Sequence, residues 1–330
     1  MLQIRGQALR GLGRWPEAIE TLERGWGLAR RTAFPSTVRA RSANNLATTL
    51  IYAGQPDRAM PYLREALANW RELGGEDSSS ALTIMANLAG LLHQRGELDA
   101  AESLYREAID RRTRRFGASG ALAAAHLNLG ALLALTGPAE EALDHAETGL
   151  EMILRYEGTD SLGHARALLS RGRVLRDLGQ RERASADLGA ARDMFSDRLG
   201  PEHLFTRIAE MHEASLSPAD EAEPRFAALA ETLDAMQPAS GRYLASALCE
   251  LARLRLELGR NGEAREPASR CLALREESLG EESWETLEAA ALLALASGHD
   301  TGIIATWRDV AGTKRRAGHP RVRWWDGRSP

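Results

Sequence analysis

Lysine is almost missing from this sequence of 330 residues. Lys314 is the only one, so 41 of the 42 basic residues are arginine. A GC-rich genome explains such a bias, but the absence also limits the chemistry. Before residue 314 the chain has neither the lysine of a Walker-type phosphate loop nor an amine that could form a Schiff base. The sequence excludes both chemistries over nearly its whole length.

Cysteine and long apolar runs are also scarce. A small disulfide-rich secreted protein would carry more cysteines than Cys249 and Cys271. Residues 1–12 lack the apolar run of a signal peptide, and the longest such run, residues 289–296, is far too short to span a bilayer. We therefore expect a cytoplasmic protein without a membrane partner. The helical pattern begins at Met1 with no cap before it, as in a piece of a longer chain.

Aromatic residues make up only 5% of the chain, and the net charge is −4. Abundant alanine and leucine with few aromatics favours helices over a β-sandwich. A nucleic-acid binder is more often strongly basic, so we expect no nucleic-acid partner.

Catalytic and metal-binding motifs are absent as well. The chain has no His-Glu-x-x-His zinc motif, no Gly-x-Ser-x-Gly elbow and no dinucleotide fingerprint. The densest acidic and histidine cluster, within residues 202–213, is better explained as a solvated helix face than as a metal site. Cys249 and Cys271 fit small packing residues better than nucleophiles. We expect no enzymatic activity, no cofactor and no metal.

What is present is a repeat: an apolar residue, a glycine, and an alanine five residues after that glycine. Successive glycines lie 41, 42, 41, 42 and then 80 residues apart. Because 80 is nearly two units, we expect a degenerate copy near Leu216, Ser217 and Ala222. A constant period of this length indicates a repeat architecture. The six matching pairs are Gly13/Ala18, Gly54/Ala59, Gly96/Ala101, Gly137/Ala142, Gly179/Ala184 and Gly259/Ala264.

Each unit predicts a hairpin of two helices. Gly54 ends the first helix of the second unit, and Pro56 opens its second helix, where a missing N–H costs nothing. Small residues at fixed places in both helices predict a close approach, which larger residues would overpack. Arg171 replaces the usual leucine of this contact in the fifth unit, so we expect the contact there to be looser or turned outward. The apolar face of the second unit, at positions i, i+3, i+4 and i+7, consists of Ala43, Leu46, Ala47 and Leu50.

These residues carry a resemblance to a known family. The segments Ala-Asn-Asn-Leu-Ala (43–47), Ala-Asn-Leu-Ala (86–89) and Leu-Asn-Leu-Gly (127–130) resemble tetratricopeptide repeats. The period of about 42 residues matches the long form found in kinesin light chains and in many bacterial proteins. The resemblance implies an all-α fold: an α-solenoid, a right-handed superhelix of about seven helix-hairpin repeats plus a terminal cap.

The domain boundaries follow from where the pattern holds. We expect a repeat superhelix over residues 1–300, with a degenerate repeat at about residues 201–238. Over residues 301–330 we expect a capping helix followed by a basic, disordered tail that contains Trp324 and Trp325.

In tetratricopeptide arrays the first helix of each hairpin lines the concave surface. The corresponding positions here hold Asn45, Asn87 and Asn128 at one register, and an amide can pair with the backbone of an extended peptide. The alternative is that these asparagines are inherited from a repeat consensus without a ligand. Arginine forks on the same face suit a carboxylate or a phosphate, although ordinary solvated arginines explain them equally well. The residues predicted to bind a peptide are Arg41, Asn45, Tyr52, Asn87, Gln94, Asn128, Arg166 and Arg173.

The leading hypothesis is a scaffold that binds a peptide or a partner helix in its concave groove. The alternative is a sensory or regulatory segment of a larger signalling protein, such as a serine/threonine kinase or a transcription regulator. The sequence indicates neither the partner nor the oligomeric state.

Overall fold

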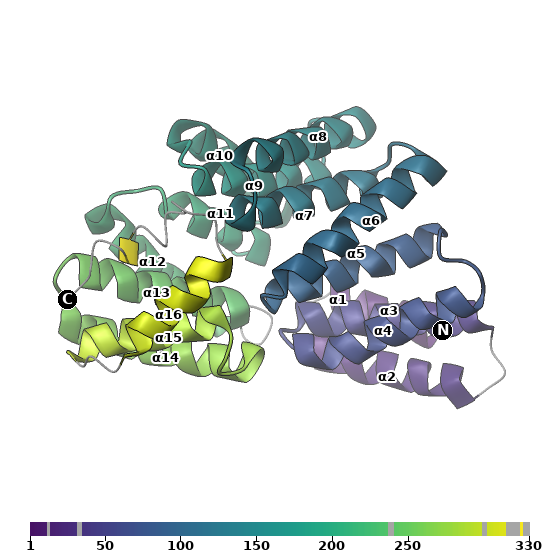
Figure 1. The fold of residues 1–330 in the computed structure, drawn as a ribbon, viewed down its shortest axis with the longest axis horizontal. Helices are drawn as coiled ribbons and strands as arrows, with labels where there is room; N and C mark the ends of the chain where they lie inside the picture. Colours follow the sequence, from purple (N-terminus) through teal and green to yellow (C-terminus); the bar gives the residue numbers. More distant parts are fainter. Residues whose placement is uncertain (12–13, 32–34, 237–240, 299–301, 315–323, 326–330) are drawn as a thin grey trace. The chain divides into compact units, whose positions relative to one another are not determined.

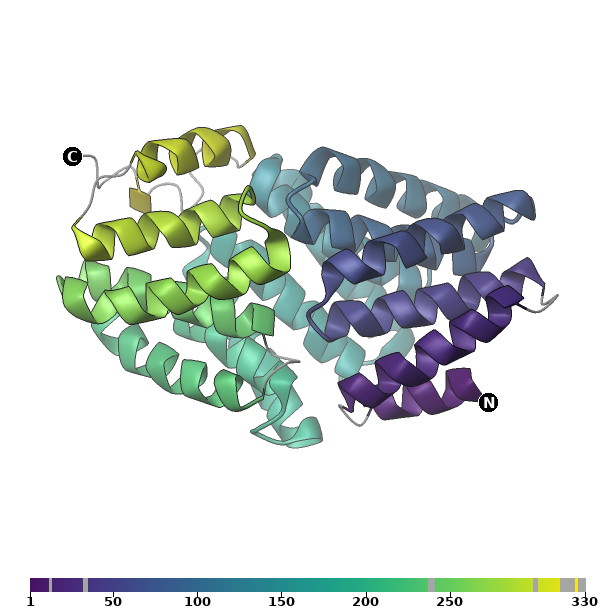
Figure 2. The same ribbon diagram turned by 90° about the horizontal axis from the view of Figure 1, so that it is seen from below.

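Every regular element in the described part of the chain is an α-helix. The structure is a computed structural model that describes residues 1–11, 14–31, 35–236, 241–298, 302–314 and 324–325. Within these ranges there are sixteen α-helices and no strand, so the all-α class is confirmed. The backbone divides into two compact units, residues 1–117 (unit 1) and residues 118–330 (unit 2). Figures 1 and 2 show the helices of both units.

Unit 1 holds three helix hairpins, in which each odd-numbered helix packs against the even-numbered helix that follows it. The first helix of one hairpin also contacts the first helix of the next, because α1 touches α3 and α3 touches α5. The six helices are α1 (Leu2–Gly11), α2 (Trp15–Arg31), α3 (Ser36–Tyr52), α4 (Pro56–Glu72), α5 (Ser79–Gln94) and α6 (Leu98–Phe116).

Unit 2 continues the same arrangement with four hairpins and two further helices. Seven hairpins in the described residues, followed by α15 and α16, confirm the predicted solenoid of helix-hairpin repeats. The ten helices are α7 (Gly120–Thr136), α8 (Ala139–Glu157), α9 (Leu162–Asp177), α10 (Arg181–Leu199), α11 (Leu204–Ala214), α12 (Ala219–Ala235), α13 (Gly241–Glu257), α14 (Asn261–Leu279), α15 (Trp284–Ser297) and α16 (Ile303–Lys314).

The turns form where the sequence predicted them. Gly54 follows α3 with φ of 73°, a left-handed conformation that glycine adopts without strain. Pro56 is the first residue of α4. Gly13, in the first copy of the pattern, lies outside the described residues. Four first helices have a serine N-cap whose hydroxyl accepts a backbone N–H, at Ser78, Ser119, Ser161 and Ser283.

Small residues allow the two helices of a hairpin to approach closely. A Cβ atom on Gly130 of α7 would lie 2.8 Å from the carbonyl oxygen of Ala142 on α8. In the fifth unit Arg171 does not turn outward. Its guanidinium instead forms two hydrogen bonds of 2.7 and 2.8 Å with the carboxylate of Asp187, which is buried on α10. An ion pair replaces the apolar contact there.

The degenerate repeat consists of α11 and α12. Helix α11 has 11 residues, whereas α9 has 16, and Ser217 stands where the other repeats have glycine. Pro218 caps the start of α12. The predicted boundaries at residues 201–238 and between residues 300 and 301 stay predictions.

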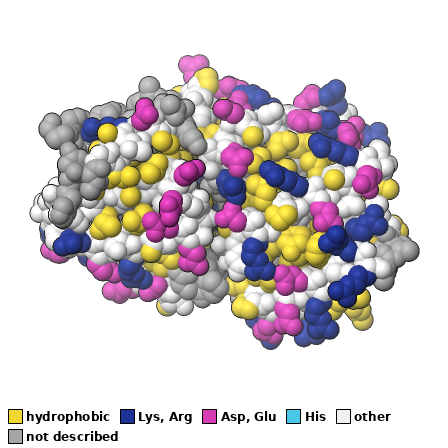
Figure 3. Space-filling view, turned by 60° about the horizontal axis from the view of Figure 1, so that its bottom comes forward, with side chains coloured by type: hydrophobic (Ala, Val, Ile, Leu, Met, Phe, Trp, Pro, Cys, Tyr) yellow, Lys and Arg dark blue, Asp and Glu magenta, His cyan; other side chains and the backbone are white. Residues whose placement is uncertain are grey.

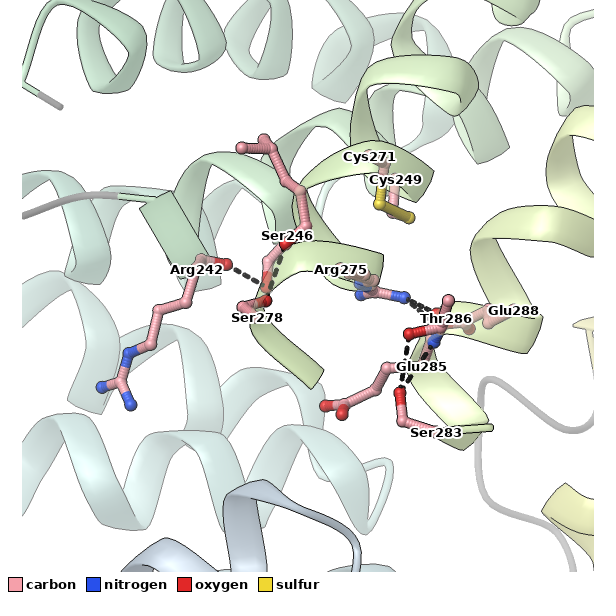
Figure 4. Close-up of a disulfide and its surroundings, with 11 residues drawn as sticks. Arg242, Ser246, Cys249, Cys271, Arg275, Ser278, Ser283, Glu285, Thr286 and Glu288 are labelled. Carbon is pink, nitrogen blue, oxygen red and sulfur yellow. Dashed lines mark hydrogen bonds and ion pairs between the residues drawn. A yellow bond between two sulfur atoms is a disulfide. The ribbon is translucent and has the colours of Figure 1, made fainter. Parts of the chain in front are cut away.

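The two cysteines form a disulfide that joins α13 to α14, a bond that the sequence analysis did not predict (Figure 4). Both are buried, and their Cα atoms are 5.5 Å apart. They occupy the positions ten residues before and twelve residues after Gly259. At the same two positions around Gly137, Leu127 packs against Gly149, so these positions face each other within a hairpin. The repeat geometry therefore brings the two sulfur atoms together.

The expected disordered tail is wrong at two residues. Trp325 is buried and its ring centroid lies 4.8 Å from that of Trp307 on α16. The guanidinium of Arg308 donates a hydrogen bond of 2.9 Å to the Trp325 carbonyl. Burying two indoles gains more than the ordering of two residues costs, which explains why this part of the tail packs. Residues 315–323 and 326–330 lie outside the described residues.

Candidate functional site

The first helix of each hairpin leaves one stripe of side chains that the hairpin does not bury. On α3, Ala43, Leu46 and Leu50 are completely buried, whereas none of the four residues on the opposite stripe is buried. The same contrast holds at the predicted positions of α5, α7, α9 and α13. Any role of these residues in binding stays a prediction. The stripes comprise Arg41, Asn45, Thr48 and Tyr52; Thr83, Asn87, Gly90 and Gln94; Ala124, Asn128, Ala131 and Leu135; Arg166, Ser170, Arg173 and Asp177; and Ser246, Glu250, Arg253 and Glu257.

Two asparagines of unit 1 connect successive first helices. The Asn45 amide of α3 donates a hydrogen bond of 2.9 Å to the side-chain oxygen of Gln3 on α1. The Asn87 amide of α5 donates one of 3.0 Å to the side-chain oxygen of Asn44 on α3. Asparagine is a poor residue inside a helix, and these bonds explain its presence without a ligand. The structure thus gives the asparagines a packing role that the sequence did not predict.

The other predicted residues of unit 1 do not form one cluster with a shared partner. The Tyr52 ring stacks on Trp15 of α2, with centroids 6.3 Å apart and planes at 27°. Tyr52 is nevertheless 49% exposed, so part of the ring is accessible. Arg41 is exposed on the same helix, and Gln94 is half-buried at the end of α5. An exposed tyrosine and an exposed arginine on one stripe offer an aromatic surface and a positive charge.

Asn128, Arg166 and Arg173 belong to unit 2. Asn128 is exposed on α7. It lies in unit 2, whereas Asn45 and Asn87 lie in unit 1. The Arg166 guanidinium of α9 lies 4.8 Å from the ring centroid of Phe205 on α11, a cation–π contact. Burial and the nearby Arg166 charge lower the pKa of His203.

Arg173 is the most unusual of the predicted residues. Its Nε atom is buried and has no hydrogen-bond partner among the described residues. Burial, followed by the neighbouring charge of Arg176, lowers the Arg173 pKa. Asp177 could have neutralised it, but this carboxylate bonds Arg176 at 2.7 Å instead. Arg173 therefore carries a half-buried positive charge that has no ion pair in the described part of the chain.

Two residues that the sequence did not single out border Arg173. Arg242 and Tyr243, at the start of α13, lie close enough to affect the Arg173 pKa. The Tyr243 ring packs against the apolar cluster that includes Leu168 and Leu169, and the Arg242 guanidinium lies 4.4 Å from its centroid. Their separation of about seventy residues from α9 leaves no signal in local periodicity.

The densest acidic and histidine cluster of the sequence forms ion pairs with a neighbouring arginine. Glu202 and Glu210, from the densest cluster of the sequence, both bond Arg207, at 2.7 and 2.8 Å. Among the described residues, no three His, Cys, Asp or Glu side chains gather as metal ligands. No described helix is long and apolar enough to cross a membrane.

On the face shown in Figure 3, acidic and basic side chains are intermingled, with hydrophobic patches between them. Recognition on this face would therefore depend on local sites and not on one broad charge field.

Comparison with family models matches most of the chain to a single description. A model described as Tetratricopeptide repeat matches residues 1–69, 38–114 and 121–197. A second model with the same description matches residues 244–285. No curated protein sequence matches this chain.

Solved structures with similar folds share little sequence with the chain. A Rap protein complexed with Competence and Sporulation Factor has a TM-score of 0.71 at 13% identity, covering 95% of this chain and 86% of that one. The Rap conjugation gene regulator of the plasmid pLS20, in complex with a Phr peptide, has a TM-score of 0.64 at 18% identity, covering 83% and 72%. The kinesin light chain TPR-like repeats of Podosopora anserina give 0.49 at 18% identity, covering 60% and 94%. At these identities the likeness concerns the fold.

Proposed function

This chain belongs to the tetratricopeptide repeat family, and on that basis we propose that it is a scaffold that binds another protein, without an enzymatic activity of its own. The binding surface in this proposal is the stripe on the first helices, and the ligand is a peptide or a partner helix. Two proteins with a similar fold were solved with a signalling factor or a peptide, which supports the proposal by analogy only.

The observation that carries the proposal is Arg173. Arg173 is half-buried, and its buried Nε has no hydrogen-bond partner among the described residues, which is costly because a desolvated polar group is stabilised only by pairing. A carboxylate from a ligand would remove this cost, and the guanidinium fork is suited to bind it with two hydrogen bonds. We therefore place the carboxylate of an acidic side chain or of a peptide C-terminus against Arg173. Arg242 would add a second positive charge nearby.

The test has two steps. Cross-linked pull-down from the native cytoplasm, followed by mass spectrometry, identifies partners of the wild-type chain. The affinity of each partner is then measured for wild type, for Arg173→Gln and for Arg155→Gln, a matched control at an exposed arginine of α8. We expect Arg173→Gln to weaken binding by about tenfold or more, as for other charge-assisted hydrogen bonds. Loss of binding in Arg155→Gln with full retention in Arg173→Gln would place the ligand elsewhere.

The same variant separates a binding role from a structural one. Arg173→Gln removes a half-buried charge that has no ion pair within the described residues, so the free energy of unfolding should stay the same or rise by up to about 1 kcal/mol. A variant that folds as well and binds worse indicates a residue kept for its ligand.

The cytoplasmic location stays a prediction, because disulfides persist chiefly in oxidising compartments.

A further inference from the structure

The stripe of α13 is already in contact with a side chain from the C-terminal end of the chain. The Arg253 guanidinium lies 5.6 Å from the ring centroid of Trp324. The Trp324 indole N–H donates a hydrogen bond of 3.3 Å to the Glu257 carboxylate. Arg253 and Glu257 occupy the positions of α13 that correspond to Arg173 and Asp177 on α9. Trp324 thus lies on the surface that the proposed function assigns to a ligand.

Carboxylates hold the guanidinium of Arg253 in place. It bonds Glu250 on one side, at 3.1 Å through Nε, and Glu257 on the other, at 2.9 Å. Burial lowers the pKa of Arg253, but the two carboxylates outweigh it, so that the pKa is raised on balance. A fixed guanidinium beside a carboxylate acceptor satisfies both features of an indole: the negative ring face and the N–H donor.

Trp324 and its neighbour Trp325 differ in burial. Trp325 is 1% exposed and packs with Trp307, so it anchors the segment in the core of unit 2. Trp324 is half-buried and meets Trp325 edge-on, with ring centroids 5.0 Å apart. An anchored segment therefore presents one further indole to the stripe.

We infer that Arg253 and Glu257 form a binding subsite for an indole side chain, and that Trp324 occupies this subsite within the same chain. This inference rests on the proposed function, since it names the residue type that a partner presents on α13. A partner segment with an exposed tryptophan takes the place of Trp324. The intramolecular contact keeps the subsite filled until such a partner binds. It lowers the apparent affinity for the partner, because the partner can bind only during the fraction of time in which Trp324 is out of the subsite.

The experiment uses the full chain and a defined probe. The probe is a fluorescent peptide with the sequence of residues 318–330 in which Trp325→Ala removes the core anchor and Trp324 is kept. Its affinity is measured for wild type, for Trp324→Ala and for Trp324→Ala combined with Arg253→Gln. Thermal melts confirm that each variant folds. A control peptide with both tryptophans replaced by alanine reports binding that does not depend on the indole.

We expect Trp324→Ala to bind the probe at least tenfold more tightly than wild type, because its subsite is vacant. Arg253→Gln should cancel this gain, and the control peptide should not bind. Equal affinity of wild type and Trp324→Ala would overturn the inference, as would unchanged binding after Arg253→Gln or no saturable binding to Trp324→Ala. Because the probe is not the cellular partner, a failure of the Arg173 test with a positive result here would reject the proposed ligand site and keep the indole subsite.

Discussion

The two units use equivalent positions of their first helices in different ways. In unit 1 the amides of Asn45 and Asn87 bond the preceding helix, so the stripe helps to hold the repeats together. In unit 2 the equivalent stripes carry Arg166, Arg173 and Arg253, and Arg173 has no ion pair within the described residues. A constant period determines where a side chain lies, whereas its neighbours decide whether it stabilises the fold or remains available to a ligand.

The disulfide gives the largest expected difference between the units. Cys249 and Cys271 are 22 residues apart, and closing a loop of that size in the unfolded chain stabilises a protein by about 3 kcal/mol. Reduction, or Cys249→Ala with Cys271→Ala, should therefore destabilise α13 and α14 and leave unit 1 unchanged. Hydrogen exchange resolved by peptide measures both units in one sample. Equal loss of protection in α3 and in α13 would contradict a local role.

A histidine pair should make the hairpin of α7 and α8 in unit 2 sensitive to acid. The Nδ1 atoms of His126 on α7 and His145 on α8 are 2.8 Å apart, and Glu141 lies 3.9 Å from His145. Burial and the His145 charge lower the pKa of His126 to about 4. Because this is below the unfolded value of about 6.5, protonation favours the unfolded state. Stability is complete above pH of about 6.5 and is lost as the pH falls toward 4.

The expected loss is about 2 kcal/mol between neutral pH and pH of about 4, allowing for partial solvent exposure. Urea unfolding at several pH values, monitored by exchange in α7 and α8, checks it. His126→Asn should flatten the pH profile of this hairpin, and His164→Asn, at a histidine of α9 outside the pair, is the matched control. A steep profile that persists in His126→Asn would assign the acid sensitivity to other groups.

Asn87 and Asn128 test whether the asparagines stabilise unit 1 more than unit 2. Asn87→Ala removes the hydrogen bond to Asn44 and should lower the free energy of unfolding by about 1 kcal/mol. Asn128→Ala, at an exposed asparagine of the same register in unit 2, should change it by less than about 0.5 kcal/mol. Chemical denaturation of both variants gives the two values. If Asn128→Ala costs as much as Asn87→Ala, the two units do not differ in the way described.

Periodicity predicted the helices well because the pattern is local. The buried face of α3, the turn at Gly54 and the exposed stripes all follow from residues within one hairpin. Periodicity did not predict contacts made between hairpins or over long separations. The Trp324 contact with Arg253 joins residues 71 positions apart and leaves no repeating signal.

Two further features depend on which side chains are paired. Arg171 and Arg173 are two residues apart on α9 and look alike in the sequence. Arg171 forms a hydrogen bond with the buried carboxylate of Asp187. Asp177, which lies near Arg173, forms its ion pair with Arg176. Only the positions of the competing carboxylates distinguish a structural arginine from one available to a ligand. The sequence therefore predicted which stripe of α9 is not buried, but not which of its arginines lacks an ion pair among the described residues.

The most direct test of the central claim, that a ligand carboxylate pairs with Arg173, is a double-mutant cycle. The partner found by pull-down is titrated calorimetrically with its acidic residue intact or changed to the amide, against wild type and Arg173→Gln. We predict a coupling free energy of about 1.5–3 kcal/mol between the carboxylate and Arg173, because each substitution removes the same charge-assisted hydrogen bonds. Independent effects of the two substitutions, with coupling below about 0.5 kcal/mol for every acidic residue of the partner, would contradict the account.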